Sequence, residues 1–302
     1  MAAFWTDKFS FSTGAVRYRD LAYLILTNDA LAEDRVAYSI LATWDPAQPW
    51  YQIQNKWTCP SVCVVKHPKE QGVAIGEMGE AYVTGRKDDH EETVADGKLS
   101  PQTRGTLRCV RAVEGKAYAA GMHRQVYRRD DRDKWTCIDE TMRPPAGSED
   151  VVGFEAIDGF SAKDLYAVGW EGEIWHYDGR AWKQADSPTN AILTNVCCAG
   201  DGKVYACGGK GLLVRGRGAD WEVVDHEDTK QDFWGFAWFG ERLHLSSTRS
   251  VWVLDGDHLQ RVKMGEDIPE TCYHLSAADG VLWSIGAKDV MAFDGKNWTR
   301  ID

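Results

Sequence analysis

Two runs of acidic side chains are the first candidates for chemistry in this sequence. Residues 88–92 read Asp-Asp-His-Glu-Glu, and residues 225–228 read Asp-His-Glu-Asp. Clustered carboxylates can coordinate Ca2+ or Mg2+, and they can also attract a basic partner. Neither run has the alternating D-x-D-x-D spacing of a calcium loop. We therefore interpret both runs as solvated loops and predict no metal site.

The cysteines and histidines do not indicate a catalytic centre either. The eight cysteines lie in apolar, strand-like stretches, and the pairs Cys59/Cys63 and Cys197/Cys198 lack the spacing of a zinc site. We expect them to be reduced and buried. The eight histidines are scattered, and the sequence contains no H-E-x-x-H, G-x-S-x-G or P-loop motif. We predict that the protein is not an enzyme and uses no cofactor.

The elements that would position any site come from a repeat. A short turn between two strand-like stretches recurs six times, and its last three intervals are 39 residues each. A fixed period of this length is typical of a repeat architecture. The turn begins at Gly76, Gly121, Gly169, Gly208, Ser247 and Gly286.

Each repeat predicts four short strands joined by tight turns. The third and fourth strands are joined by a turn of the D-G-x-x-W type, as at residues 178–182 and 294–298. Gly in such turns supplies the positive φ that two-residue hairpins need. The N-terminal segment supplies a seventh unit with a weaker match. Its strands are expected at residues 9–18, from Ala22, from Ala37 and at residues 51–54.

These units predict an all-β protein, a seven-bladed β-propeller of four-stranded antiparallel blades, with six blades as the main alternative. One such unit alone buries too little apolar surface, whereas radial packing buries both faces of each sheet. We expect a single domain over residues 1–302. Its blades are expected at roughly residues 8–57, 58–98, 105–140, 151–186, 192–226, 231–264 and 270–302.

The repeat resembles the broad superfamily of YVTN-type, BNR (Asp-box)-like and WD-repeat β-propellers. The resemblance rests on the stretch D-L-Y-A-V-G-W-x-G-x-I-W-H-Y-D-G-x-x-W from Asp164 to Trp182, with weaker copies at residues 203–221 and 280–298. Of a strict Asp box only Asp, Gly and Trp remain, and the Gly-His…Trp-Asp signature of WD repeats is missing. The resemblance implies the fold but not the function, because such propellers serve as enzymes, lectins, assembly factors and scaffolds.

The tryptophan of each D-G-x-x-W-type turn has a structural and a functional interpretation. A repeated aromatic residue at one blade position can pack between neighbouring blades, and this is the interpretation that we favour. Stacking on a sugar is the alternative, which would make the protein a carbohydrate-binding propeller. The residues concerned are Trp135, Trp182, Trp221 and Trp298.

The turns between second and third strands vary although the scaffold around them repeats. Varied tips on a constant scaffold suit a protein-binding surface, and Met, Trp and Arg are enriched at interface centres. An aromatic stretch before the fifth shared turn adds two candidate anchors. The predicted partner-binding residues are Glu77, Met78, Met122, His123, Arg124, Trp170, Glu171, Lys210, Arg249 and Lys288 from the turns, and Phe233 and Trp234 from the aromatic stretch.

The net charge of the chain indicates which kind of partner it can bind. The chain has 46 acidic and 35 basic residues and a net charge of −11, which opposes nucleic-acid binding and favours a basic protein partner. No window approaches 18 apolar residues, and the N-terminal residues lack the pattern of a secretion signal. We therefore expect a cytoplasmic bacterial protein that contacts no membrane and no nucleic acid.

These observations predict a protein–protein interaction module. Its most concrete form is an inhibitor or immunity protein that binds and neutralises a partner, such as a secreted bacterial toxin, through acidic and aromatic loops on one propeller face. We expect the partner to be another protein, such as a basic toxin or enzyme, and the free protein to be monomeric. The alternative is a propeller that binds a carbohydrate or another small ligand, and a third candidate is a hydrolase with a site built from distant loops.

Overall fold

The computed structural model describes residues 7–48, 50–85, 87–145 and 151–301. The chain divides into two compact units, one made of residues 1–59 and 225–302, and one made of residues 60–224. The first six residues, on which the expected absence of a secretion signal depends in part, lie outside the described ranges.

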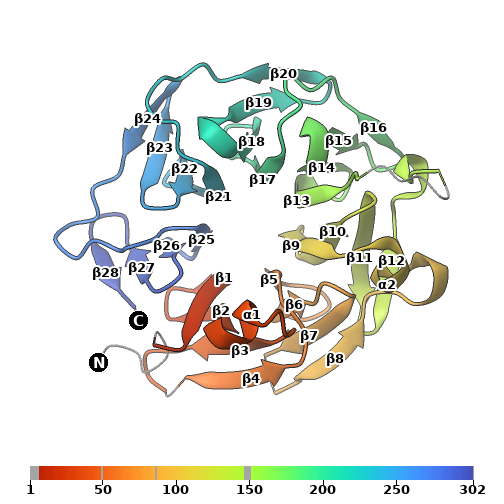
Figure 1. Cartoon of the computed structure of the whole chain (residues 1–302), viewed down its shortest axis with the longest axis horizontal. Helices are drawn as coiled ribbons and strands as arrows, with labels where there is room; N and C mark the ends of the chain where they lie inside the picture. The colour runs from red at the N-terminus through yellow and green to blue at the C-terminus, as the bar shows by residue number, and fades with distance from the viewer. Residues whose placement is uncertain (1–6, 49, 86, 146–150, 302) are drawn as a thin grey trace. The chain divides into compact units, whose positions relative to one another are not determined.

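The unit of residues 60–224 contains four antiparallel sheets, each with its four strands in chain order (Figure 1). The first strands of consecutive sheets contact each other. We number these sheets 2 to 5, and their strands are β5 (Ser61–Val65), β6 (Gln71–Ile75), β7 (Glu80–Thr84) and β8 (His90–Thr93); β9 (Leu107–Val113), β10 (Lys116–Gly121), β11 (Gln125–Asp131) and β12 (Lys134–Cys137); β13 (Phe154–Ser161), β14 (Asp164–Gly169), β15 (Ile174–Tyr177) and β16 (Trp182–Gln184); β17 (Leu193–Cys198), β18 (Val204–Gly208), β19 (Leu213–Arg217) and β20 (Asp220–Val223).

The other unit contains three sheets of the same kind. The first strand of sheet 7 contacts the first strand of sheet 1 and the first strand of sheet 6. The strands of sheets 1, 6 and 7 are β1 (Phe9–Tyr18), β2 (Leu21–Asn28), β3 (Ser39–Trp44) and β4 (Tyr51–Asn55); β21 (Phe233–Phe239), β22 (Arg242–Ser247), β23 (Val251–Asp255) and β24 (His258–Arg261); β25 (His274–Ala278), β26 (Val281–Ile285), β27 (Val290–Phe293) and β28 (Trp298–Arg300).

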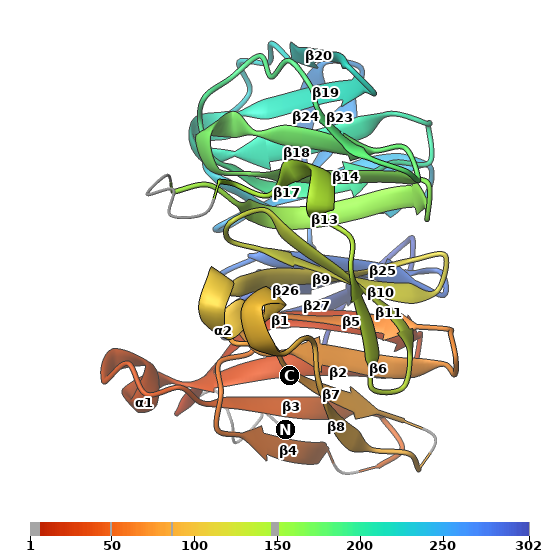
Figure 2. The same ribbon diagram turned by 90° about the vertical axis from the view of Figure 1, so that its right-hand side faces the viewer.

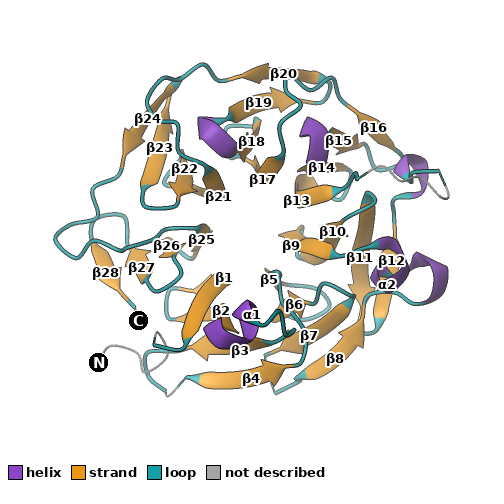
Figure 3. Ribbon diagram, viewed as in Figure 1, coloured by secondary structure: helices purple, strands orange, loops and turns teal. Residues whose placement is uncertain are grey.

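Seven four-stranded antiparallel sheets make the fold a seven-bladed β-propeller, as predicted, and the six-bladed alternative is wrong. The N-terminal segment forms a complete sheet 1, whose first strand coincides with the expected residues 9–18. Helices are few and short (Figure 3), namely α1 (Asp29–Glu33), α2 (Pro101–Arg104) and single turns of 3-10 helix. Within the described ranges, no helix has the length and apolar character needed to cross a membrane.

The tryptophans of the D-G-x-x-W-type turns pack between neighbouring sheets, as predicted. Trp135 lies against the apolar cluster of sheets 2 and 3, Trp182 lies in that of sheets 3 and 4, and Trp221 lies against that of sheets 4 and 5. Trp298 packs in the same way against the cluster of sheets 6 and 7. Full burial of a large apolar side chain contributes about 1.5–3 kcal/mol to stability. Trp182 is buried, and Trp135, Trp221 and Trp298 are half-buried against these clusters, so all four contribute to packing between sheets.

A close approach of two backbone segments explains the glycine that opens the shared turn. Gly169 faces the carbonyl oxygen of Gly153, the residue before β13, and a Cβ atom on Gly169 would overlap that oxygen. Sheet 6 differs, because it has Ser247 at this position. The Ser247 hydroxyl donates a hydrogen bond to Gln231 Oε1 at 2.6 Å. In sheet 6 a side-chain hydrogen bond therefore holds the segment before β21. In sheet 4 the corresponding contact is a close approach of two backbone segments.

Candidate partner-binding site

The six predicted turns all join the second strand of a sheet to its third. They lie at residues 76–79, 122–124, 170–173, 209–212, 248–250 and 286–289. Sheet 1 has a counterpart at residues 29–38 that was not predicted, which contains α1 and lies beyond the ends of β2 and β3 (Figure 2). A signal for it was present, since the strands expected from Ala22 and Ala37 leave an acidic segment between them.

Arg124, at the tip of sheet 3, is held in place by its neighbours. Its Nε donates to Glu173 Oε2 at 2.8 Å, and its Nη2 bonds to the other carboxylate oxygen. The guanidinium carbon also lies 5.1 Å from the centre of the Trp175 ring, within the range of a cation–π contact. Glu173 is buried. Arg124 thus links sheet 3 to sheet 4, and its charge is already neutralised within the protein.

Other predicted residues near this tip are also engaged or half-buried. Met122 and His123 are half-buried, and their backbone amides donate to the segments before β9 and β13 respectively. The Trp170 indole donates to Glu155 Oε1 at 2.7 Å, and the Arg108 guanidinium lies 3.3 Å from the same oxygen. Polar contacts therefore fix the turn of sheet 4 to its own first strand.

Four further predicted residues lie at tips with more open surroundings. Met78 is 41% exposed, Glu77 is half-buried, and Glu171 and Lys210 are exposed. Glu171 and Lys210 occupy equivalent places in the turns of sheets 4 and 5, with φ values of 55° and 58°. Non-glycine residues adopt this left-handed conformation infrequently, and the turn geometry imposes it here.

Lys288, at the tip of sheet 7, is a tether to sheet 1. Its ammonium donates to Asp29 Oδ2 at 2.6 Å and to the Phe9 carbonyl oxygen at 2.9 Å. Burial by itself raises the pKa of Asp29, but hydrogen bonds from Lys288 and Ser10 outweigh that effect and hold the pKa below its usual value. Asp29 is the first residue of α1, so this ion pair anchors the protruding loop to sheet 7.

Phe233 was predicted to be an exposed anchor, and that prediction is wrong. Phe233 is the first residue of β21, and it is fully buried. Leu107, Phe154 and Leu193 hold the same place at the start of β9, β13 and β17, and all three are fully buried as well. The repeat itself carried this signal, because an apolar residue opens the first strand of each of these sheets.

Trp234, the next residue, is 40% exposed. The pairing of β21 with β22 skips it, because a β-bulge lies between Phe233 and Gly235. The Trp234 indole donates to Thr248 Oγ1 at 3.3 Å, and its ring meets the Tyr273 ring edge-on at 6.2 Å between centroids. A shallow open hollow adjoins this corner of the sheet, lined by Lys230, Gln231, Asp232, Thr248 and Arg249.

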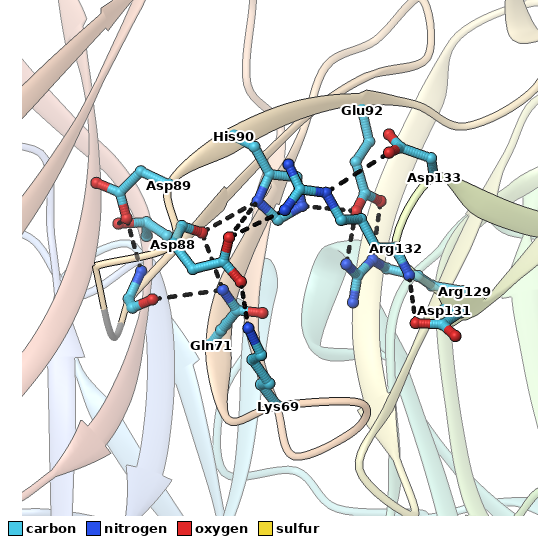
Figure 4. A network of polar contacts seen from close by, with 12 residues as sticks. Lys69, Gln71, Asp88, Asp89, His90, Glu92, Arg129, Asp131, Arg132 and Asp133 are labelled. Carbon is cyan, nitrogen blue, oxygen red and sulfur yellow. Dashed lines mark hydrogen bonds and ion pairs between the residues drawn. The ribbon is translucent and has the colours of Figure 1, made fainter.

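The acidic run at residues 88–92 leads into a buried ion-pair network, so its interpretation as a solvated loop is wrong (Figure 4). Glu92 of β8 accepts two hydrogen bonds from Arg129 of β11, from Nε at 2.8 Å and from Nη2 at 2.6 Å. The two side chains are 0% and 1% exposed. The Trp135 indole donates to Glu92 at 2.9 Å, and His90 Nε2 lies 3.0 Å from Glu92 Oε1. The network joins sheet 2 to sheet 3.

Opposing effects set the proton affinity of Glu92. Burial by itself raises the pKa of this carboxyl, but the hydrogen bonds and charge of Arg129 outweigh burial. The pKa of Glu92 is therefore lowered, and the ionised form is the one that the fold stabilises. At the outer edge of the network, Asp88 pairs with Lys69 at 2.7 Å and with Arg132 at 3.1 Å.

The second acidic run, residues 225–228, is only partly solvated. His226 is buried, and Asp228 Oδ2 accepts a hydrogen bond from the backbone amide of Leu259 at 2.7 Å. Among the residues that the structure describes, no three His, Cys, Asp or Glu side chains are grouped so that they could hold a metal ion.

All eight cysteines are free thiols, five buried and three half-buried. Burial raises the pKa of Cys63 to about 12 and that of Cys109 to about 11. A thiol with so high a pKa stays protonated at neutral pH and is a poor nucleophile and a poor metal ligand. The five buried cysteines act as small side chains of the core, as expected, whereas Cys109, Cys137 and Cys198 are only half-buried.

The geometry defines a β-propeller whose second-to-third-strand turns differ from blade to blade in exposure and charge. No protein-family model matches the chain. The chain is 50% identical over 299 residues to the Immune protein Tsi7 of Pseudomonas aeruginosa, and the match covers 97% of each protein. The chain belongs to the family of that immune protein. This membership confirms the predicted class, an immunity protein.

Comparison with solved structures supports the same fold. The structure of YCF48 bound to a D1 peptide is 14% identical, with a TM-score of 0.67 over 96% of this chain and 93% of that one. The WD40 propeller domain of Doa1 is 11% identical, with a TM-score of 0.66 over 97% and 92% of the two chains. The Cps50 (Swd1) propeller domain of Myceliophteria thermophila is 11% identical, with a TM-score of 0.66 over 95% of this chain and 100% of that one. At these identities the likeness establishes the propeller fold alone.

Proposed function

We propose that this protein binds a toxin protein and neutralises it by covering the toxin surface, without catalysis of its own. The observation that carries the proposal is the 50% identity to the Immune protein Tsi7 over 97% of both chains. The match spans the whole propeller and not a single blade. It therefore supports a shared mode of action and not merely a shared scaffold.

The second-to-third-strand turns are the surface that we assign to the toxin. They carry Met, Arg and a half-buried Trp, which are residue types enriched at interface centres, beside exposed Glu and Lys side chains that suit a polar rim. The net charge of −11 favours approach of a basic toxin by long-range attraction. We further propose that the free protein is monomeric and acts in the cytoplasm.

The D-G-x-x-W-type turns keep only the Asp, Gly and Trp of an Asp box. Among β-propellers, they favour a relation of this chain to the YVTN-type and BNR-like groups.

Co-expression tests this function. The toxin candidate is the protein encoded beside the gene for this chain. We expect its expression alone to stop growth of a bacterial host, and co-expression of this chain to restore growth and to give a stable complex of the two purified proteins. A toxin that still kills in the presence of equal amounts of this chain, together with no complex on gel filtration, would overturn the proposal.

A further inference from the structure

We propose that the hollow beside Trp234 in sheet 6 binds an acidic segment of the toxin, a carboxylate next to an apolar side chain. The inference rests on the proposed function and assigns one contact within it. Lys230 and Arg249 would receive the carboxylate, and the exposed face of the Trp234 ring would receive the apolar neighbour.

A β-bulge places the aromatic side chain at this corner. Bulges re-aim a side chain out of the alternating pattern of the strand. The first strands of sheets 4 and 5 have a bulge at the same place, where Glu155 and Thr194 stand instead of tryptophan. Glu155 bonds to Trp170, and Thr194 Oγ1 donates to a backbone carbonyl. Sheet 6 uses the same irregularity to display a tryptophan that is 40% exposed.

The walls of the hollow are fixed before any partner binds. The Ser247 hydroxyl donates to Gln231 at 2.6 Å, and the Trp252 indole donates to Ser247 Oγ at 3.1 Å. The backbone carbonyl of Thr248 accepts from the amide of Cys272 at 2.9 Å. The backbone around Lys230 and Arg249 is therefore pre-organised, which lowers the conformational entropy lost on binding.

The charge of the hollow points to a carboxylate as its ligand. Lys230 and Arg249 are exposed, and within the described ranges neither side chain makes an ion pair or hydrogen bond. Asp232 also lines the hollow, so its lining side chains carry a net charge of +1 in a protein of net charge −11. Arg249 presents planar donors that match a carboxylate.

The carboxylates before the third strands of sheets 4 and 7 have different partners. In sheet 4 the residue before the third strand is Glu173, which binds Arg124 of sheet 3. In sheet 7 the residue before the third strand is Asp289, which instead pairs with Arg300 at 2.7 Å and accepts from two backbone amides. Asp289, the counterpart of Glu173 in sheet 7, is thus committed within its own sheet, and Arg249 is left for a carboxylate from outside the chain.

Calorimetric titration of the purified toxin from the co-expression experiment tests this assignment. We expect Trp234→Ala to weaken binding by about 30-fold and Arg249→Ala by about tenfold, as for centres of protein interfaces. Arg249→Glu should weaken binding more than Arg249→Ala, because it repels the incoming carboxylate. The matched control is Arg242→Glu, the same charge change at the opposite end of β22, which should leave affinity within about twofold.

The outcomes separate the two proposals. If the wild-type protein binds the toxin and the Trp234 and Arg249 variants bind equally well, the assignment of the hollow is wrong and the proposed function stands. Tighter binding by Arg249→Glu would also overturn the assignment, because it would indicate a basic segment at this place. If the wild-type protein binds no toxin, both proposals fail. The Arg249 series decides the question even if Trp234→Ala does not fold.

Discussion

Two arginines at equivalent turns of the repeat have opposite surroundings. Arg124 of sheet 3 is bound by Glu173 and stacks on Trp175, whereas Arg249 of sheet 6 is exposed. The two turns differ in backbone as well as in partners: Arg124 directly precedes β11 and has a φ of 54°, whereas Ser250 stands between Arg249 and β23. The carboxylate that the following sheet offers differs too. Asp289 of sheet 7 is occupied by Arg300. The turn of sheet 3 therefore stabilises the fold, and the turn of sheet 6 is the one that we propose contacts a partner.

The comparison extends to the tryptophans beside these turns. Trp170 of sheet 4 bonds to Glu155 and is half-buried, whereas Trp234 of sheet 6 is 40% exposed next to a cationic hollow. The two tryptophans hold different places, a turn in sheet 4 and the bulged first strand in sheet 6. Ion pairs and hydrogen bonds within the chain, more than residue type, distinguish the structural positions from the positions that we propose for binding.

The largest expected effect is at the buried pair that joins sheets 2 and 3. Arg129→Met leaves Glu92 buried without its cation, and removing one partner of a buried ion pair costs about 3–5 kcal/mol. Urea unfolding should show this loss as a lower midpoint. The control is Arg132→Met on the exposed edge of the same network, which should cost less than about 1 kcal/mol. Equal stability of the two variants would contradict a structural role for the buried pair.

Arg124→Ala should have the next largest effect. It removes a charge-assisted pair and leaves Glu173 buried with the Trp175 indole as a donor but without its cation, so we expect a loss of about 2 kcal/mol in the free energy of unfolding. Urea unfolding measures it against the wild-type protein, and Arg124→Lys should recover only part of the loss, since lysine cannot form the two-point contact. A stability equal to the wild type would show that Arg124 is as free as Arg249.

Acid should weaken the junction of sheets 2 and 3. The folded pKa of Glu92 lies below its ordinary value of 4.5. Its stabilising contribution is therefore complete above pH 4.5 and is lost as the pH falls through the folded pKa. Thermal unfolding between pH 7 and pH 3 should show a falling midpoint. In Glu92→Gln the midpoint should be lower at pH 7 and fall less on acidification, and an unchanged acid dependence would exclude Glu92 as a contributor.

The smallest expected effect on stability is at Arg249. Arg249→Ala removes an exposed side chain that makes no ion pair within the described ranges, so the free energy of unfolding should stay within about 0.5 kcal/mol of the wild type. Thermal unfolding of Arg249→Ala and Arg124→Ala under the same conditions compares their stabilities directly. A destabilisation comparable to that of Arg124→Ala would show that Arg249 also holds the fold.

The repeat made most of the fold predictable, and long-range pairing set the limit. The spacing of Gly121, Gly169 and Gly208 and the aspartate-glycine turns indicated four-stranded units, because tight turns depend on local sequence. The expectation of an exposed anchor was wrong for Phe233 but not for Trp234, because a β-bulge between Phe233 and Gly235 lets one of two adjacent residues point inward and the other outward. Alignment of Phe233 with the residues that open the other first strands would have placed it in the core.

Partners distant in sequence account for the other errors. Glu92 and Arg129 are 37 residues apart, and nothing in the run Asp-Asp-His-Glu-Glu shows that its last carboxylate faces a buried arginine of the next sheet. For the same reason, the sequence could not separate Arg124, which has an internal partner, from Arg249. The sequence predicted where the turns lie. It could not predict whether a charged side chain in a turn has a partner within the chain, because that depends on how neighbouring sheets pack.

The most direct test of this account measures stability and toxin affinity together for Arg124→Ala and Arg249→Ala. We predict that Arg124→Ala lowers the free energy of unfolding by about 2 kcal/mol, with little change in affinity for the toxin when folded. Arg249→Ala should leave stability unchanged and weaken toxin binding by about tenfold. The reverse pattern, or equal effects of both substitutions on both quantities, would contradict the division between structural and binding turns.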